Sequence, residues 1–132
     1  MKVLALASYP VEAAATRFRI AQFVKPLGER GIDVTIRPFL DAAGFAALYS
    51  GGSPITKAAA MFKPVALRVA DVTSATKYDA VFVQREAMLF GPPLFEALAR
   101  GRGRGRVPMI LDLDDATYVR YVSPTYGRLG SL

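Results

Sequence analysis

Four short apolar runs, separated by segments with helical spacing, constrain the fold of this chain more than any other feature. The runs are Val3–Ala7, Ile32–Arg37, Ala80–Val83 and Val107–Leu111. The first is apolar without alternation, as expected of a strand that is covered on both faces. The second alternates apolar with polar residues and ends at Pro38, which is typical of a strand near a sheet edge. We therefore expect an α/β fold, a Rossmann-like doubly wound parallel sheet with helices on both faces.

The segments between the runs predict the helices. Thr16 is a candidate N-cap for a helix that Pro26 should kink and that should end near Gly31. Its core-facing residues would be Phe18, Ile20, Phe23, Val24 and Leu27. A short helix over 41–49, a turn over 51–54, a helical region over 57–75 broken around Pro64, and a helix from 91–93 to Gly101 complete the pattern. Residues 1–132 then form one domain.

Composition excludes several chemistries. The chain has no cysteine and no histidine, which rules out thiol nucleophiles, Cys/His zinc sites and Ser–His triads. The net charge of +6 favours anionic partners such as phosphates, acidic lipid headgroups or nucleic acid. The run Val3–Ala7 is shorter than the roughly 7–15 apolar residues of an export signal, and no run approaches the ~20 of a membrane span. We expect a cytoplasmic protein, with peripheral contact at the inner membrane face as a further possibility.

Polar and charged residues follow three of the predicted strands. They lie in Ser8–Arg19, in Gln84–Glu86 and in Asp112–Asp115. Ligands of doubly wound sheets bind outside the carboxyl ends of the strands, so we expect these segments to share one edge. This edge is the predicted site.

The aspartates of ILDLDDATY are compatible with several functions. A phosphatase of the haloacid-dehalogenase type has an apolar strand followed by D-x-D-x-T, but Ala116 stands where that threonine belongs. A nucleotide hydrolase would need a Gly-Lys-Ser/Thr phosphate loop, which the chain lacks. Paired carboxylates can also hold Mg²⁺ or Mn²⁺ in a sugar transferase, or simply cap a helix or turn. A noncatalytic module that binds an anionic ligand or an acidic membrane surface is an alternative function. The Gly-Arg repeat from Gly101 to Arg106 has neither dinucleotide-binding spacing nor interleaved aromatics, so we expect a solvated connection and no nucleic-acid partner.

Taken together, four segments resemble the N-terminal domain of a GT-B-fold glycosyltransferase, close to glycosyltransferase family 4. They are KVLALAS, TRFRIAQFVKPLGERGIDVTIRPF, YDAVFVQRE and VPMILDLDDA, in the family's order. The resemblance implies the acceptor-side half of an enzyme that transfers a sugar from a nucleotide-sugar donor to a sugar or lipid-linked acceptor. It also implies that the chain is a truncated domain, inactive without a C-terminal donor-binding domain, and holds no cofactor itself.

The resemblance carries over two sets of residues. Acceptor or anion binding would fall to Arg17, Arg19, Gln84, Arg85 and Glu86, and catalysis to Asp112, Asp114 and Asp115, with no metal. Residues i and i+2 do not share a helix face, so we expect Arg17 to point at ligand and Arg19 to pair with an acidic residue of the edge. With no histidine present, a carboxylate is the natural general base.

Two features bear on these expectations. Many relatives have a glycine-rich loop after the first strand, whereas Ser8 to Ala15 contains no glycine. A parallel sheet that is cut short leaves an unpaired edge strand, so we expect a homo-oligomer formed through that edge.

Overall fold

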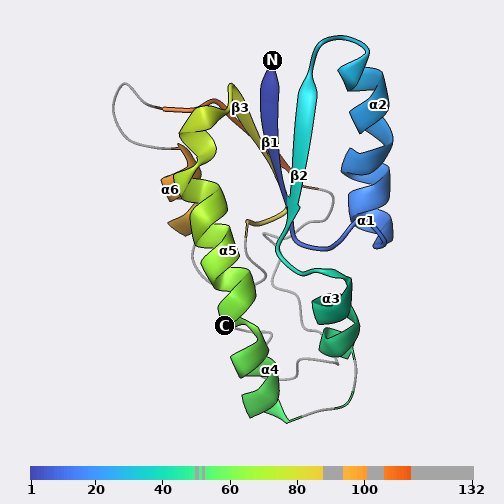
Figure 1. Cartoon of the computed structure of the whole chain (residues 1–132), viewed down its shortest axis with the longest axis vertical. Coiled ribbons are helices and arrows are strands. Elements are labelled where there is room, and N and C mark those ends of the chain that lie inside the picture. Colours follow the sequence, from blue (N-terminus) through green and yellow to red (C-terminus); the bar gives the residue numbers. More distant parts are fainter. Residues whose placement is uncertain (50, 52, 88–93, 101–105, 114–132) are drawn as a thin grey trace.

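In the computed structural model, residues 1–49, 51, 53–87, 94–100 and 106–113 are described, and they form an α/β domain around an all-parallel sheet (Figure 1). The strands are β1 (Lys2–Ala7), β2 (Asp33–Pro38), β3 (Ala80–Gln84) and β4 (Met109–Asp112), in the order β2-β1-β3-β4. The helical elements are α1 (Ala14–Thr16), the π-helical turn η1 (Arg17–Ala21), α2 (Gln22–Gly28), α3 (Ala42–Tyr49), α4 (Pro54–Ala60), α5 (Phe62–Thr73), the 3₁₀ turn η2 (Ala75–Lys77) and α6 (Leu94–Arg100). The predicted parallel α/β fold is confirmed.

Helices cover both faces of the sheet, as expected. On one face, Leu4 and Leu6 of β1 and Val81 and Val83 of β3 pack with buried residues of α5 and α6. On the other face, Ala5 and Ala7 pack against Ile20 of η1, with Val34, Ile36 and Phe82 beside them. Successive residues of a strand point to opposite faces, so the unbroken apolar run of β1 supplies both cores.

The predicted strand positions agree with the structure. β2 pairs only with β1, from Lys2↔Asp33 to Ala7↔Pro38, and forms one edge of the described sheet. β4 forms its other edge, pairing with β3 from Val81↔Met109 to Gln84↔Asp112. Oligomerisation through either edge stays a prediction.

The first helical region differs from the prediction at its start and in its buried face. The helix begins at Ala14, so Thr16 lies inside it and is not its N-cap. Ile20 is buried, but Phe18 and Phe23 are 57% and 48% exposed, so their expected place in the core is wrong. The π turn at η1 is the physical reason: it closes with a hydrogen bond from the Gln22 amide to the Arg17 carbonyl, five residues back, and changes which residues face the sheet.

The end of this region and the later helices follow the sequence signals more closely. Gly31 has φ +75°, the left-handed conformation of a helix-ending glycine. Ser53 caps α4, accepting a hydrogen bond from the Ile55 amide, so the predicted turn already contains the helix start at Pro54. The interruption between α4 and α5 falls at Met61, three residues before Pro64, because proline fits the first turn of a helix. The predicted start of α6 at 91–93 and its end at Gly101 lie outside the described residues.

Within the described parts of the chain, none of the helices is both long and apolar enough to cross a membrane.

Candidate functional site

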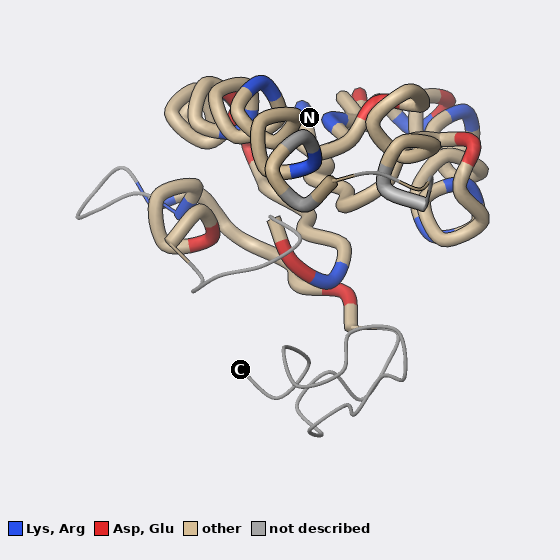
Figure 2. The backbone as a smooth tube through the Cα atoms, turned by 90° about the horizontal axis from the view of Figure 1, so that it is seen from below, with Lys and Arg blue, Asp and Glu red and all other residues tan. Residues whose placement is uncertain are grey.

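The carboxyl ends of β1, β3 and β4 form the edge at which the predicted site residues were expected to meet (Figure 2). The chain moves outward from β1 to β2 and then returns to β3, so β1 and β3 flank the switch point of the sheet. Ligands of doubly wound sheets bind at such a point. The Ser8 hydroxyl joins the two strand ends, donating to the Glu86 carbonyl at 3.1 Å and lying 3.4 Å from the Gln84 carbonyl. The sequence-predicted segments Ser8–Arg19 and Gln84–Glu86 are thus brought together.

Gln84 is a buried amide at the centre of this edge. Its side chain is 2% exposed, and its Oε1 lies 3.3 Å from the Oγ1 of Thr16, which is fully buried. The Thr16 hydroxyl also donates to the Tyr9 carbonyl at 2.8 Å. A hydroxyl has a single proton, so the shorter contact takes it and the Gln84 amide is held less firmly.

The other atom of this amide is an unused donor. The Gln84 Nε2 makes no hydrogen bond to any residue that the structure describes. A buried polar group without a partner costs about 1–3 kcal/mol, so native proteins keep few of them, often at functional sites. The sequence predicted Gln84 at this edge, where the structure places it, but gave no sign of its burial.

Arg85 follows with a strained backbone. Its φ is +64°, and its amide donates to the Asp112 carbonyl at 2.9 Å, which continues the pairing of β3 with β4. A non-glycine residue in the left-handed region stores backbone strain, and such residues cluster at ligand sites. The turn redirects the chain at the end of β3, where Arg85 and Glu86 are half-buried.

Arg19 and Asp112 form a two-pronged ion pair across the edge. The Arg19 Nε donates to Oδ2 of Asp112 at 2.7 Å, and its Nη2 donates to Oδ1. The expectation that Arg19 pairs with an acidic residue of the edge is confirmed. Each carboxylate oxygen of Asp112 accepts one hydrogen bond from Arg19, so in this arrangement the pair fixes the orientation of both side chains.

The structure places Arg17, another predicted site residue, outside this ion pair. Arg17 is exposed, with its guanidinium carbon 4.9 Å from the centroid of the Phe18 ring. Asp114 and Asp115 lie outside the described residues. Among the residues that are described, no group of three or more histidine, cysteine, aspartate or glutamate side chains is placed to hold a metal ion.

Sequence reasoning missed Arg68, an arginine buried in α5. The residue is 1% exposed, and its Nη2 and Nη1 donate to the carbonyls of Ala7 at 2.9 Å and Arg37 at 3.1 Å. These carbonyls lie at the ends of β1 and β2, so one guanidinium ties the two strands together. The signal in the sequence is weak, since Arg68 is one charge within the largely apolar segment that forms α5.

Burial shifts the titration of Arg68 and its neighbour Asp71. Desolvation lowers the pKa of Arg68 to about 10, although the charges of Asp71 and Glu96 oppose the shift. Desolvation also raises the pKa of Asp71, partly offset by Arg68 and Arg37, whose nitrogens lie 3.8 Å and 3.5 Å from its carboxylate. Arg68 and Asp71 keep their charges at a desolvation cost, and the hydrogen bonds of Arg68 to the ends of β1 and β2 stabilise the arrangement.

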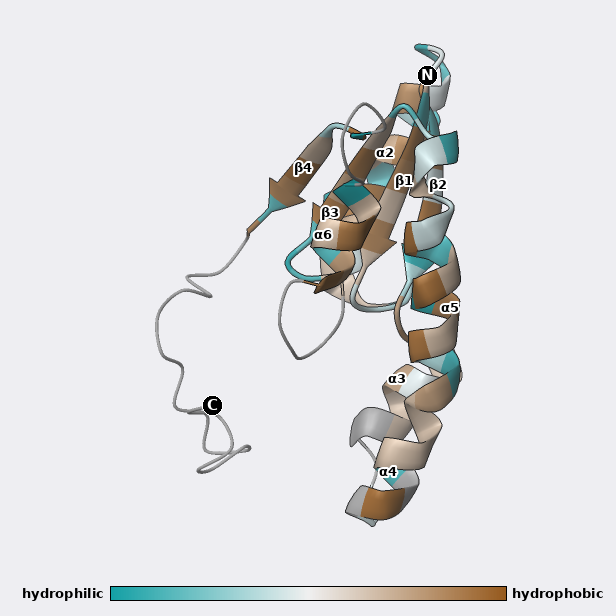
Figure 3. Cartoon of the chain, turned by 90° about the vertical axis from the view of Figure 1, so that its left-hand side faces the viewer, coloured by the Kyte–Doolittle hydropathy of each residue, from teal (hydrophilic) through white to brown (hydrophobic). Residues whose placement is uncertain are grey.

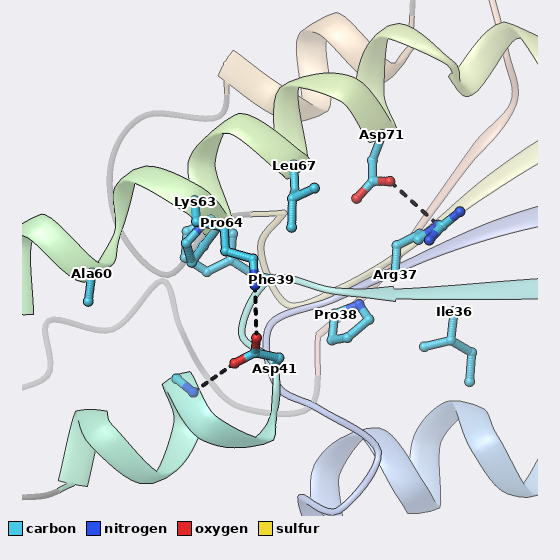
Figure 4. A pocket seen from close by; sticks show the side chains of 11 residues that line it. Ile36, Arg37, Pro38, Phe39, Asp41, Ala60, Lys63, Pro64, Leu67 and Asp71 are labelled. Atoms are coloured by element: carbon cyan, nitrogen blue, oxygen red, sulfur yellow. Dashed lines mark hydrogen bonds and ion pairs between the residues drawn. The ribbon is translucent and has the colours of Figure 1, made fainter.

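A pocket lies beside Arg68 and Asp71, away from the β1–β3–β4 edge (Figure 4). It has a volume of about 300 Å³ between the end of β2, α3 and α5, and is crossed by the ion pairs Lys63–Asp41 (3.6 Å) and Arg37–Asp71 (3.5 Å). The Gly44 amide of α3 donates to Asp41 and is the main cause of the lowered pKa of that carboxyl. A second hollow of about 400 Å³, lined by Arg100, Arg106 and β4, contains no predicted site residue.

Comparison with protein families, with characterised proteins and with solved structures found no match to this chain.

Proposed function

We propose that this chain is the acceptor-side domain of a nucleotide-sugar glycosyltransferase of the GT-B type. One observation carries the proposal: polar and charged side chains converge at the switch point of a parallel sheet. This is where doubly wound domains bind ligands. The segments that meet there are those on which the resemblance to glycosyltransferase family 4 rests.

The edge offers groups suited to a hydroxylated, anionic acceptor. Arg17 is exposed and its guanidinium can contact an anionic group of the acceptor, while the Arg19–Asp112 pair forms one wall of the edge. Gln84 adds an amide donor that a hydroxyl oxygen of the acceptor can satisfy after a small movement of the strained Arg85 turn.

The reaction needs a base for the acceptor hydroxyl. In the proposed reaction, that hydroxyl loses its proton to a carboxylate, its oxygen bonds to the anomeric carbon of the donor, and the nucleoside diphosphate leaves. Arg19 occupies both oxygens of Asp112, so we assign Asp112 to positioning and keep Asp114 and Asp115 as candidates for the base. A second domain would hold the donor and the leaving diphosphate.

The test is sugar transfer by the product of the complete reading frame that encodes this chain. Release of nucleoside diphosphate would be measured with a panel of UDP- and GDP-sugars and with sugar and lipid-linked acceptors. We expect acceptor-dependent release, and we expect Asp112→Asn to lower kcat by about a hundredfold through loss of positioning.

Asp33→Asn is the matched control, because Asp33 is an exposed aspartate at the opposite, amino end of β2. It should leave the rate unchanged. Absence of release with every donor would contradict the proposal. If the protein instead hydrolyses p-nitrophenyl phosphate with magnesium, and Asp112→Asn abolishes this hydrolysis, the protein is a phosphatase and the proposal of sugar transfer is wrong.

A further inference from the structure

The pocket at the end of β2 is lined by charges that balance. α5 contributes Lys63, Leu67 and Asp71, each four residues after the previous one, so the three side chains lie on one face of the helix. Across the pocket, Asp41 faces Lys63 at 3.6 Å and Arg37 faces Asp71 at 3.5 Å. The described lining therefore holds two cations and two carboxylates and has no net charge.

Apolar side chains form the rest of the wall. In Figure 4, Leu67 lies along α5 between the two ion pairs. Figures 1 and 3 show α3 beside α4 and the first turns of α5, beyond the carboxyl ends of the strands. The volume of about 300 Å³ is at the lower end of the range for small-molecule sites, so a ligand of this pocket is small. The apolar lining residues are Ile36, Pro38, Phe39, Ala60, Pro64 and Leu67.

The ion pairs of the pocket are longer than hydrogen bonds, which ordinarily span about 2.7–3.2 Å between nitrogen and oxygen. Asp71 is the clearest case. Its side chain is 17% exposed, and its cationic neighbours Arg37 and Arg68 stay 3.5 Å and 3.8 Å away. Desolvation raises the pKa of this carboxyl, because burial costs the carboxylate more than the two nearby charges return. Asp71 therefore has acceptor oxygens that a donor of a ligand can use.

Hydroxyl groups match this lining better than charged groups do. A hydroxyl donates one hydrogen bond and accepts others, so it can donate to Asp71 and accept from Arg37 while the ion pair stays in place. A charged ligand would meet a like charge beside each opposite one and would have to separate an ion pair. The apolar wall suits the C–H groups of a carbon ring.

We propose that this pocket binds a small neutral molecule with several hydroxyl groups, such as a monosaccharide or a cyclitol. Asp41 and Asp71 accept hydrogen bonds from its hydroxyls. Arg37 and Lys63 donate to them, and Leu67 packs against the ring. The proposal does not depend on sugar transfer, because the pocket shares no residue with the β1–β3–β4 edge.

Amide chemical shifts of the chain, measured by NMR, test the proposal. Methyl glucoside, methyl mannoside and myo-inositol are the neutral probes, and inorganic phosphate, ethanolamine and glycine supply an anion, a cation and a zwitterion. At least one neutral probe should shift the amide signals of Gly44, Leu67 and Asp71, with a Kd of about 1–10 mM for a ligand of about a dozen non-hydrogen atoms. The amide signals of Gln84 and Asp112, at the β1–β3–β4 edge, should stay in place.

Three variants locate the binding. Ala60→Phe places a ring in the pocket, since Ala60 is an exposed lining residue at the end of α4, and should weaken binding by about tenfold. Ala59→Phe is the matched control, because it adds the same ring at the neighbouring exposed position outside the lining, and should leave binding unchanged. Asp71→Asn should weaken binding by about fivefold, because it replaces a charge-assisted hydrogen bond with a neutral one. Circular dichroism should show that the variants are folded, and the two alanine variants decide the question if Asp71→Asn is not.

Three results would overturn the proposal. The first is that none of the neutral probes shifts the pocket signals, or that binding survives Ala60→Phe. The second is that only phosphate, ethanolamine or glycine shifts them, which would assign the pocket to a charged ligand. The third is that a neutral probe shifts only Gln84 and Asp112, which would place its site at the β1–β3–β4 edge and leave the proposed function standing.

Discussion

An arginine binds at each side of the sheet's carboxyl edge, and the two arginines lie in opposite environments. On the β1–β2 side, Arg68 is 1% exposed and donates to backbone carbonyls. On the β3–β4 side, Arg19 has a side chain that is 39% exposed and binds the carboxylate of Asp112, the last residue of β4. A buried guanidinium loses its hydration and depends on every contact, whereas an exposed pair gives up little water and gains little. The β1–β2 side should therefore be rigid, and the β3–β4 side free to rearrange around a ligand.

The largest effect is expected at Arg68. Arg68→Met keeps an unbranched apolar chain but removes the strand-end hydrogen bonds and leaves Asp71 with fewer partners, so the free energy of unfolding should fall by about 3 kcal/mol. Arg68→Lys should recover part of this, since an ammonium can still reach a carbonyl. Urea unfolding measures both. Equal stability of Arg68→Met and the unmodified chain would remove the contrast between the two sides.

An intermediate effect is expected at Thr16 and Gln84. Thr16→Val removes a buried hydroxyl from the Tyr9 carbonyl and the Gln84 amide and should cost about 1–2 kcal/mol. Gln84→Met removes an amide whose Nε2 is unpaired, and should change stability by less than about 1 kcal/mol. In the double variant the two changes should be less than additive, as measured by a thermodynamic cycle. A larger loss in Gln84→Met than in Thr16→Val would show that Gln84 stabilises the fold.

The smallest effect is expected at Arg19. Arg19→Met breaks the exposed pair with Asp112 and should lower the free energy of unfolding by no more than about 1 kcal/mol. The loss should shrink in about 1 M salt, where charges of the surface are screened. Urea unfolding at low and high salt would measure it. A salt-independent loss as large as that of Arg68→Met would mean that both sides of the edge are equally fixed.

The fold was predictable because its signals are local. Apolar runs of the right length marked all four strands, and the alternation over Ile32–Arg37 placed β2 at an edge. The left-handed Gly31 was also foreseen, since few other residues adopt that conformation. The exposure of Phe18 and Phe23 could not be predicted, because the spacing of hydrophobic residues does not reveal a π turn.

The candidate site was predictable only where both partners lie in recognisable segments. Arg19 and Asp112 follow a helix start and a strand end, so their meeting at one edge follows from the topology. Arg68 instead binds carbonyls, which every residue has, and no residue pattern identifies such an acceptor. The orphaned amide of Gln84 and the strained φ of Arg85 depend on packing that forms only in three dimensions.

The central position of β1 has a consequence for how the chain folds as it is synthesised. β2 can pair with β1 once Pro38 has left the ribosome, but β3, its partner on the other side, is complete only about 45 residues later. At ordinary translation speeds of about 5–20 residues per second, one edge of β1 stays open for about 2–9 seconds. During this interval the open edge of β1 presents unpaired backbone N–H and C=O groups, which other chains can pair with.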